Sequence, residues 1–152
     1  MLGREISATL KGQFDHVQIN VTSLRKSEKF YESILGWLGY EKIIGISDTK
    51  DRGKAQWRRG RSRLILAQCR KEFLRHGFHR KRVGINHISF WAPTRLVVDR
   101  FYREVLLPKR YKILYGGPRE YPEYVRGYYA VYFEDPDRIK LELLTDPSFN
   151  IK

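Results

Sequence analysis

The chain repeats itself at a spacing of 71 residues, and this repeat constrains its fold more than any other feature. Four pairs match at that offset: His16 and His87, "FYESIL" at 30–35 and "FYREVL" at 101–106, Tyr40 and Tyr111, and Gly45 and Gly116. The register holds without a gap from the first pair to the last. Self-similarity at a fixed spacing is the mark of a duplicated structural unit. We therefore expect two copies of one supersecondary unit.

Each copy has the pattern of a strand, a helix and three further strands. Ser23 and Thr94 stand where a helix N-cap belongs, and Gly39 and Pro108 stand where the helices should stop. The expected ranges are 14–22, 24–38, 41–47, 54–59 and 63–69 in the first copy, and 85–92, 95–107, 110–116, 127–134 and 139–145 in the second. This predicts an α+β fold of two βαβββ modules, at 13–70 and 84–146, joined by a basic linker at 71–83.

Alternation along the strands sorts side chains between a helix-packing face and an open face. His16 and His87 fall on the open face of their strands, and so does Glu142, which stands between two leucines. A histidine alone in a strand is more often a packing residue, but two imidazoles and a carboxylate from three strands resemble a metal-ligand set. In the first copy the equivalent strand offers either Ile65, which cannot bind a metal, or, with the opposite alternation, Gln68.

Charge is concentrated in one part of the chain. The net charge is +13, and residues 50–82 contain 13 lysines and arginines against two acids, so the remainder is nearly neutral. Such a segment attracts anions, although it can equally be a solvated surface, and it contains no recognisable nucleic-acid motif. We expect Trp57 and one or two of its neighbouring arginines, Arg58 and Arg59, to face an anionic ligand, and "RHGFHRKR" at 75–82 to be a solvated loop.

Composition favours an intracellular, cytoplasmic protein. The single cysteine, Cys69, permits no internal disulfide, which fits a reducing compartment. No apolar run approaches the roughly 18 residues that a membrane span needs, and the N-terminal "MLGREISATLKGQ" lacks the apolar core of a secretion signal. We therefore expect no membrane partner.

The chain resembles the vicinal oxygen chelate superfamily, which includes glyoxalase I, bleomycin-resistance proteins and extradiol dioxygenases. The resemblance is carried by "FDHVQINVTSLRKSEKFYESILGWLGY", "NHISFWAP…VDRFYREVL" and "GYYAVYFEDPDRIKLELL". It implies that the two modules form a half-open barrel around a shared concave cavity. It also implies a divalent metal (Fe, Mn, Zn or Ni) held by His16, His87 and Glu142.

Two positions depart from the pattern of the superfamily. Glyoxalase-type members carry a further glutamate ligand, and no acid stands at that position here. The three remaining ligands match the extradiol dioxygenase arrangement better. The usual "DPDGN" turn reads "DPDRI", so Arg138 replaces a glycine.

The first functional expectation is a metal-dependent lyase or dioxygenase. Its small, anionic substrate would chelate the metal through two neighbouring oxygens. Tyr128 and Tyr132 are candidate hydrogen-bond donors or proton shuttles, or else cavity wall. Candidate substrate-binding residues are Trp57, Arg58, Gln68 and Trp91.

Two alternatives come from other classes. The first is a non-catalytic binding or resistance protein in which aromatic side chains (Trp57, Trp91 and Tyr128) stack on a flat ligand. The second is binding of nucleic acid or another polyanion by the basic segment, for which the sequence offers less support. The pattern leaves open whether one chain builds the cavity or two chains of a homodimer do.

Overall fold

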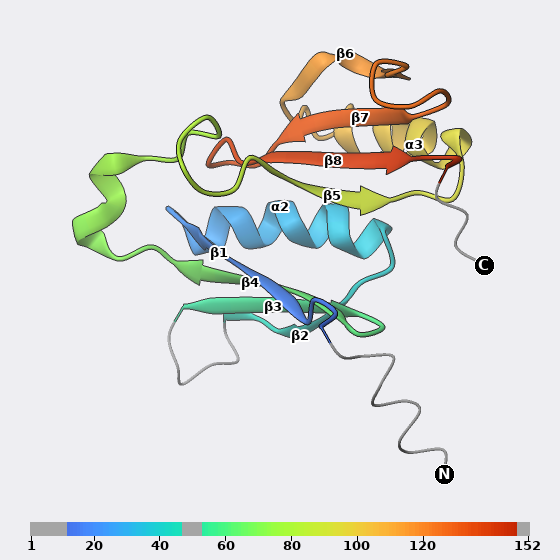
Figure 1. Ribbon diagram of the computed structural model, residues 1–152. Coiled ribbons are helices and arrows are strands. Elements are labelled where there is room, and N and C mark those ends of the chain that lie inside the picture. The colour runs from blue at the N-terminus through green and yellow to red at the C-terminus, as the bar shows by residue number, and fades with distance from the viewer. Residues whose placement is uncertain (1–11, 47–52, 149–152) are drawn as a thin grey trace.

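The computed structural model describes residues 12–46 and 53–148 (Figure 1). Residues 1–11, which include most of the stretch tested for a secretion signal, lie outside the described residues, as do 47–52 and 149–152. The first module contains β1 (His16–Val21), α2 (Leu24–Trp37), β2 (Glu41–Ile44), β3 (Lys54–Arg59) and β4 (Ser62–Gln68). The second contains β5 (His87–Trp91), α3 (Arg95–Phe101), the π-helical turn η3 (Tyr102–Leu106), β6 (Ile113–Glu120), β7 (Tyr129–Glu134) and β8 (Lys140–Thr145).

Each module folds its four strands into one mixed sheet. The strand order is β1-β4-β3-β2 in sheet A and β5-β8-β7-β6 in sheet B. In both sheets the first strand pairs in parallel with the last, and the other pairs are antiparallel. The predicted α+β fold of two βαβββ modules is therefore confirmed. The two sheets do not close into a barrel, in keeping with a half-open arrangement.

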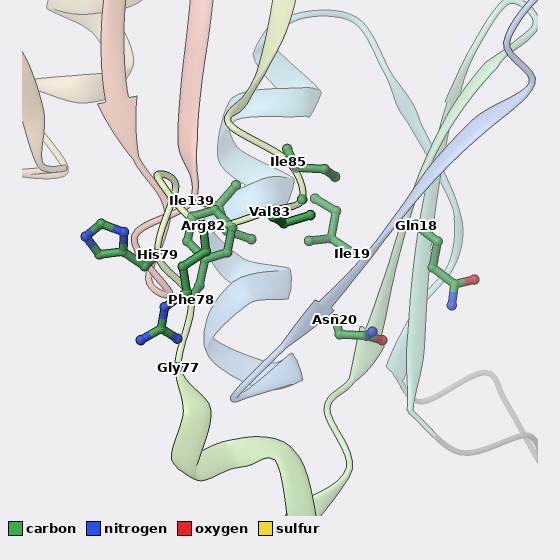
Figure 2. A pocket seen from close by; sticks show the side chains of 11 residues that line it. Gln18, Ile19, Asn20, Gly77, Phe78, His79, Arg82, Val83, Ile85 and Ile139 are labelled. Atoms are coloured by element: carbon green, nitrogen blue, oxygen red, sulfur yellow. The ribbon is translucent and has the colours of Figure 1, made fainter.

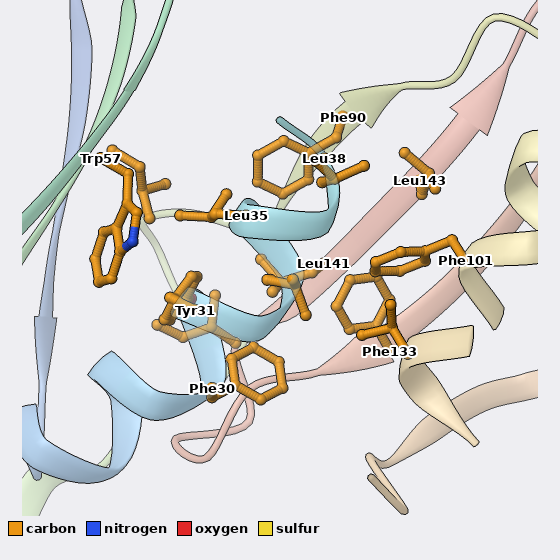
Figure 3. Close-up of a cluster of buried hydrophobic side chains, with 14 of the residues drawn as sticks. Phe30, Tyr31, Leu35, Leu38, Trp57, Phe90, Phe101, Phe133, Leu141 and Leu143 are labelled. Atoms are coloured by element: carbon orange, nitrogen blue, oxygen red, sulfur yellow. The ribbon is translucent and has the colours of Figure 1, made fainter. Parts of the chain in front are cut away.

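Helix α2 lies between the two sheets, and both modules share one hydrophobic core (Figures 1 and 3). Phe30 of α2 packs against Phe133 of β7, with 6.4 Å between the ring centroids, and Trp37 packs against Phe101 of α3 at 5.2 Å. The Tyr31 hydroxyl, fully buried, donates to Asp135 Oδ2 across the modules at 3.0 Å. The helix-packing faces of both sheets thus point toward the same core.

The two helices are capped differently at their N-termini. Thr94 caps α3 as predicted, because its side chain accepts a hydrogen bond from the Val97 amide at 3.3 Å. Ser23 holds the N-cap position of α2 but forms no side-chain cap. Gln68 of β4 performs that task instead, since its Oε1 accepts from the Leu24 amide at 3.0 Å.

The arm that joins the modules begins with the 3₁₀ helix η2 (Lys71–His76) and runs on to β5. Arg80 within it is anchored, because its Nη1 lies 2.5 Å from Oε1 of the buried Glu134, and its carbonyl accepts from Asn86 Nδ2 at 3.2 Å. The expectation that 75–82 is a solvated loop therefore does not hold at Arg80. In the part of the chain that the structure describes, no helix is long and apolar enough to cross a membrane.

Candidate functional site

The open face of sheet B carries a buried carboxylate. Leu141 and Leu143 of β8 point into the shared core, so Glu142 between them points to the opposite face. Its side chain is nonetheless only 1% exposed, because Tyr132 and Leu144 form a second apolar cluster on that face. A carboxylate in such a place costs free energy unless it is paired and hydrogen-bonded.

Three neighbours meet that requirement. Tyr128 donates its hydroxyl hydrogen to Glu142 Oε1 at 2.6 Å, and Ser89 donates to Oε2 at 2.5 Å. His87 Nε2 lies 3.3 Å from Oε2. The other ring nitrogen of His87 lies 2.8 Å from Asn86 Oδ1, an arrangement that suits an Nδ1–H donor and leaves Nε2 turned toward Glu142.

Burial and neighbouring charges shift the pKa of His87 and of two tyrosines in this cluster. Burial lowers the pKa of His87, and the Lys140 charge adds to this effect, while Glu142 opposes both. The neutral imidazole is thereby favoured. Burial and the neighbouring Glu142 carboxylate raise the pKa of Tyr128 and of Tyr132 well above the ordinary tyrosine value, so both hydroxyls stay protonated and available as donors.

Aromatic rings surround the buried carboxylate. We call them the tyrosine cluster; its members are Tyr115, Tyr121, Tyr124, Tyr128 and Tyr132. Tyr132 is central: the rings of Tyr121 and Tyr115 lie 5.2 and 5.4 Å from it, and the His87 ring lies at 6.3 Å. The open face of sheet B is thus an aromatic surface with an acid at its base.

The third predicted ligand, His16, lies on sheet A. Its Nδ1 is 2.7 Å from Asp15 Oδ2, and the same carboxylate pairs with Arg63. Over residues 12–46 and 53–148, no group of three or more His, Cys, Asp or Glu side chains is placed to hold a metal ion. One chain therefore brings His87 and Glu142 together but does not bring His16 to them.

The predicted substrate-binding residues are scattered. Trp57 is fully buried on the face of sheet A that packs on α2, and its Nε1 donates to Glu32 at 3.0 Å. The Gln68 side chain caps α2, so it lies on the side of sheet A that faces the helix. Ile65 alternates with the core residues Leu64 and Leu66 and therefore lies on the open face. Arg58 is exposed near the edge of sheet A, 3.9 Å from Glu41. Of the four, Trp91 is on the open face of sheet B, and it is 46% exposed.

Sequence reasoning did not single out Ser89, Asn86 and Lys140. Alternation along β5 already placed Ser89 on the open face, and Lys140 stands two residues before Glu142 on the same side of β8. Asn86 directly precedes His87. Strand alternation could therefore have placed Ser89 and Lys140 on the open face. It could not have predicted that Ser89 donates to a Glu142 oxygen or that Lys140 lies over the Tyr132 ring.

A separate pocket of about 330 Å³ lies between β1 and the arm (Figure 2). Gln18 and Asn20 line it from the strand side, and Arg82 and Val83 line it from the arm side. None of the predicted metal ligands or substrate-binding residues lines it. It is therefore distinct from the cluster around Glu142.

Comparison with known proteins places this arrangement in a family. Residues 13–143 match the family model of the Glyoxalase/Bleomycin resistance protein/Dioxygenase superfamily. The chain belongs to that superfamily. The match covers both modules, including His16, His87 and Glu142.

Individual relatives agree with the assignment. The chain is 37% identical over 133 residues to YqjT of Bacillus subtilis (strain 168), an uncharacterised protein, covering 85% of this chain and 95% of that one. A crystal structure of a "putative glyoxalase" from Bacillus halodurans superposes with a TM-score of 0.77 at 33% identity, over 91% of this chain and 98% of that one. A lactoylglutathione lyase from Agrobacterium tumefaciens, at 18% identity and a TM-score of 0.63 over 92% and 98% of the two chains, shares the fold.

Proposed function

We propose that this protein is a metal-dependent enzyme acting on a small oxygenated substrate. The metal would be held by His87 and Glu142 of one chain and His16 of a second copy. The observation that carries the proposal is the buried Glu142 carboxylate beside the partly exposed His87 imidazole on an otherwise aromatic open face. A buried carboxylate that is hydrogen-bonded and paired with a histidine outside the core marks a functional site more often than a packing arrangement.

The donor chemistry fits a divalent ion. Neutral imidazole and carboxylate are ordinary ligands of Fe, Mn, Zn and Ni. His87 already has the outer partner that metal-bound histidines usually have, because Asn86 Oδ1 contacts its Nδ1 and leaves Nε2 for the ion. The metal would act as a Lewis acid toward two neighbouring oxygens of the substrate.

The need for a second copy follows from the position of α2. Since α2 separates the sheets, the open faces of A and B both point away from the shared core. The first strands, β1 and β5, each lie at the edge of a sheet, and exposed aromatic side chains stand next to these edges, Phe14 at 93% and Trp91 at 46%. A second copy that covers these edges would bury apolar surface and bring its sheet A to this sheet B.

The remaining side chains of the cluster have supporting roles in this proposal. Tyr128 and Ser89 fix the orientation of Glu142 through one hydrogen bond to each oxygen. Tyr132 lies at the centre of the cluster, and its raised pKa keeps its hydroxyl protonated, so its role would be to donate a hydrogen bond to a substrate oxygen rather than to give up its proton. The second candidate function is metal-free binding of a flat ligand, which the tyrosine cluster favours.

Elemental analysis of protein purified without chelator tests the metal directly. We expect close to one divalent ion per chain in the wild type, and loss of that ion in His16→Ala, His87→Ala and Glu142→Gln. His79→Ala is a matched control, because His79 lies in the arm, and its metal content should not change. A metal-free wild type that binds aromatic compounds would favour the second candidate.

Mixing variants tests the two-chain site. His16→Ala and Glu142→Gln homodimers should each lack metal, but co-refolded mixtures contain mixed dimers with one intact site. We expect metal and activity to return toward one quarter of the wild-type level in a statistical mixture, since half the dimers are mixed and each has one of its two sites. Full metal content in a monomeric wild type, or no recovery on mixing, would contradict a shared site.

A further inference from the structure

One cation on the open face of sheet B forms no close ion pair with the residues that the structure describes. Lys140 is partly buried on β8, and its Nζ lies over the Tyr132 ring, 5.2 Å from the centroid. It forms no ion pair with any carboxylate of the described residues, because Glu142, the nearest acid on its strand, is occupied by His87 and two hydroxyls. Its position in register with His87 places it beside the candidate metal ligands.

One buried hydroxyl on the same face also lacks a hydrogen-bond partner among the described residues. Tyr121 is 3% exposed, and within the described parts of the chain its hydroxyl forms no hydrogen bond. The Arg119 guanidinium lies over its ring, 4.1 Å from the centroid. A buried donor without a partner costs about 1–3 kcal/mol, so such groups are rare unless a ligand uses them.

We propose that Lys140 and the Tyr121 hydroxyl bind the anionic group of the substrate. This inference rests on the proposed function for its site, and it names the substrate class as a small molecule that bears an oxyanion, either a carboxylate or a phosphate. Both side chains contact Tyr132: the Lys140 ammonium lies over its ring face, and the ring of Tyr121 lies 5.2 Å from its ring. The anionic end would therefore lie against Tyr132, while the oxygens that bind the metal would lie toward His87.

Charge balance around the cluster agrees with an anionic ligand. Arg80 is paired with Glu134, so it does not need a further anion, and Glu142 is already bonded on both oxygens. The charges of Glu142 and Lys140 offset each other, so the divalent ion of the proposed function would leave the cluster with a net positive charge, and Arg119 adds to it at the outer edge. A lysine ammonium can pair with either a carboxylate or a phosphate as a point charge.

The test uses the full-length protein and two probes, inorganic phosphate and acetate, titrated at constant pH and ionic strength. Backbone amide shifts in an NMR spectrum report binding. For the wild type we expect saturable shifts confined to the residues of sheet B around Lys140, Tyr132 and Tyr121 with one or both probes, and the probe that binds more tightly identifies the group. Lys140→Met should weaken this binding at least tenfold, Lys140→Arg should restore most of it, and Tyr121→Phe should weaken it several-fold.

Lys109→Met is the matched control, since Lys109 is exposed beyond η3 and its removal changes the net charge equally. Equal weakening by Lys109→Met and Lys140→Met, or no saturable shift in the wild type, would overturn the inference. Elemental analysis of the same samples separates the two proposals. If the protein holds metal but Lys140→Met has no effect on anion binding, the anion site is refuted and the metal site stands. If anion binding depends on Lys140 in a protein that holds no metal, the metal site is refuted and the anion site stands.

Discussion

The hydrogen bond between Tyr31 and Asp135 gives the sharpest test of how the modules are joined. Asp135 is 5% exposed and accepts from the amides of Asp137 and Ile139 at 2.8 Å through Oδ1, so Tyr31 is the partner of Oδ2. Tyr31→Phe removes that donor with little change in shape. A hydrogen bond to a charged group contributes about 1.5–3 kcal/mol, so we expect a loss of about 2 kcal/mol at pH 8.

The loss should depend on pH. Burial raises the pKa of Asp135 to about 6 from its ordinary 3.8. The folded state therefore holds this proton more tightly than the unfolded state. The stabilisation by that proton is full below pH 3.8 and is lost as pH rises through about 6. At pH 4.5 the carboxyl is neutral in the folded state, so Tyr31→Phe removes only a neutral hydrogen bond and should cost about 1 kcal/mol.

Urea unfolding of both proteins at pH 8 and pH 4.5 measures the difference. Tyr111→Phe is the matched control, because the Tyr111 hydroxyl lies 2.7 Å from the neutral Ser33 Oγ, also between the modules. Its cost should be about 1 kcal/mol at both pH values. In an Asp135→Asn background the cost of Tyr31→Phe should no longer change with pH. An equal cost at pH 8 and pH 4.5 in the wild-type background would refute the assignment of Asp135 as a buried, charged partner.

Three further substitutions test local features by the same unfolding measurement. Arg138→Gly should stabilise the protein by up to about 1 kcal/mol, because Arg138 has a φ of +68°, which glycine adopts without strain. Thr94→Ala should cost about 1 kcal/mol through the lost cap of α3. Arg80→Gln should cost about 1–3 kcal/mol because it leaves the buried Glu134 carboxylate without its ion-pair partner. Arg82→Gln is the control: Arg82 donates to the His76 carbonyl within the arm, so its loss should change stability by less than about 0.5 kcal/mol.

The fold was predictable from the sequence because repeat and alternation are both local signals. The strands at 54–59 and 140–145 lie within one residue of their predicted bounds, and Leu141 and Leu143 face the core as alternation requires. The predicted helix at 95–107 is one helical segment that changes to π-type bonding after Phe101, with the Leu107 amide bonded to the Tyr102 carbonyl. No propensity rule foresees such a change.

The site was harder to predict because its geometry depends on how the two sheets face each other. Alternation correctly puts Glu142 on the open face, but it says nothing of where the other sheet lies. Trp57 shows the same limit. Its position beside arginines predicted a substrate-binding residue, but its side chain is fully buried in the core on the side of α2. The resemblance to the superfamily implies a glycine at position 138, and the positive φ of Arg138 fits that expectation, since glycine adopts a left-handed conformation readily.

The position of α2 also bears on how a duplicated chain came to fold as one body. Phe30 and Trp37 pack on the second module, while Leu35 and Tyr31 fill the side toward Trp57 (Figure 3). A module alone would leave one flank of this helix in water and would have to cover it with a second copy of itself. The tandem repeat supplies that second copy on the same polypeptide. An association that would otherwise depend on protein concentration is therefore built into a single chain.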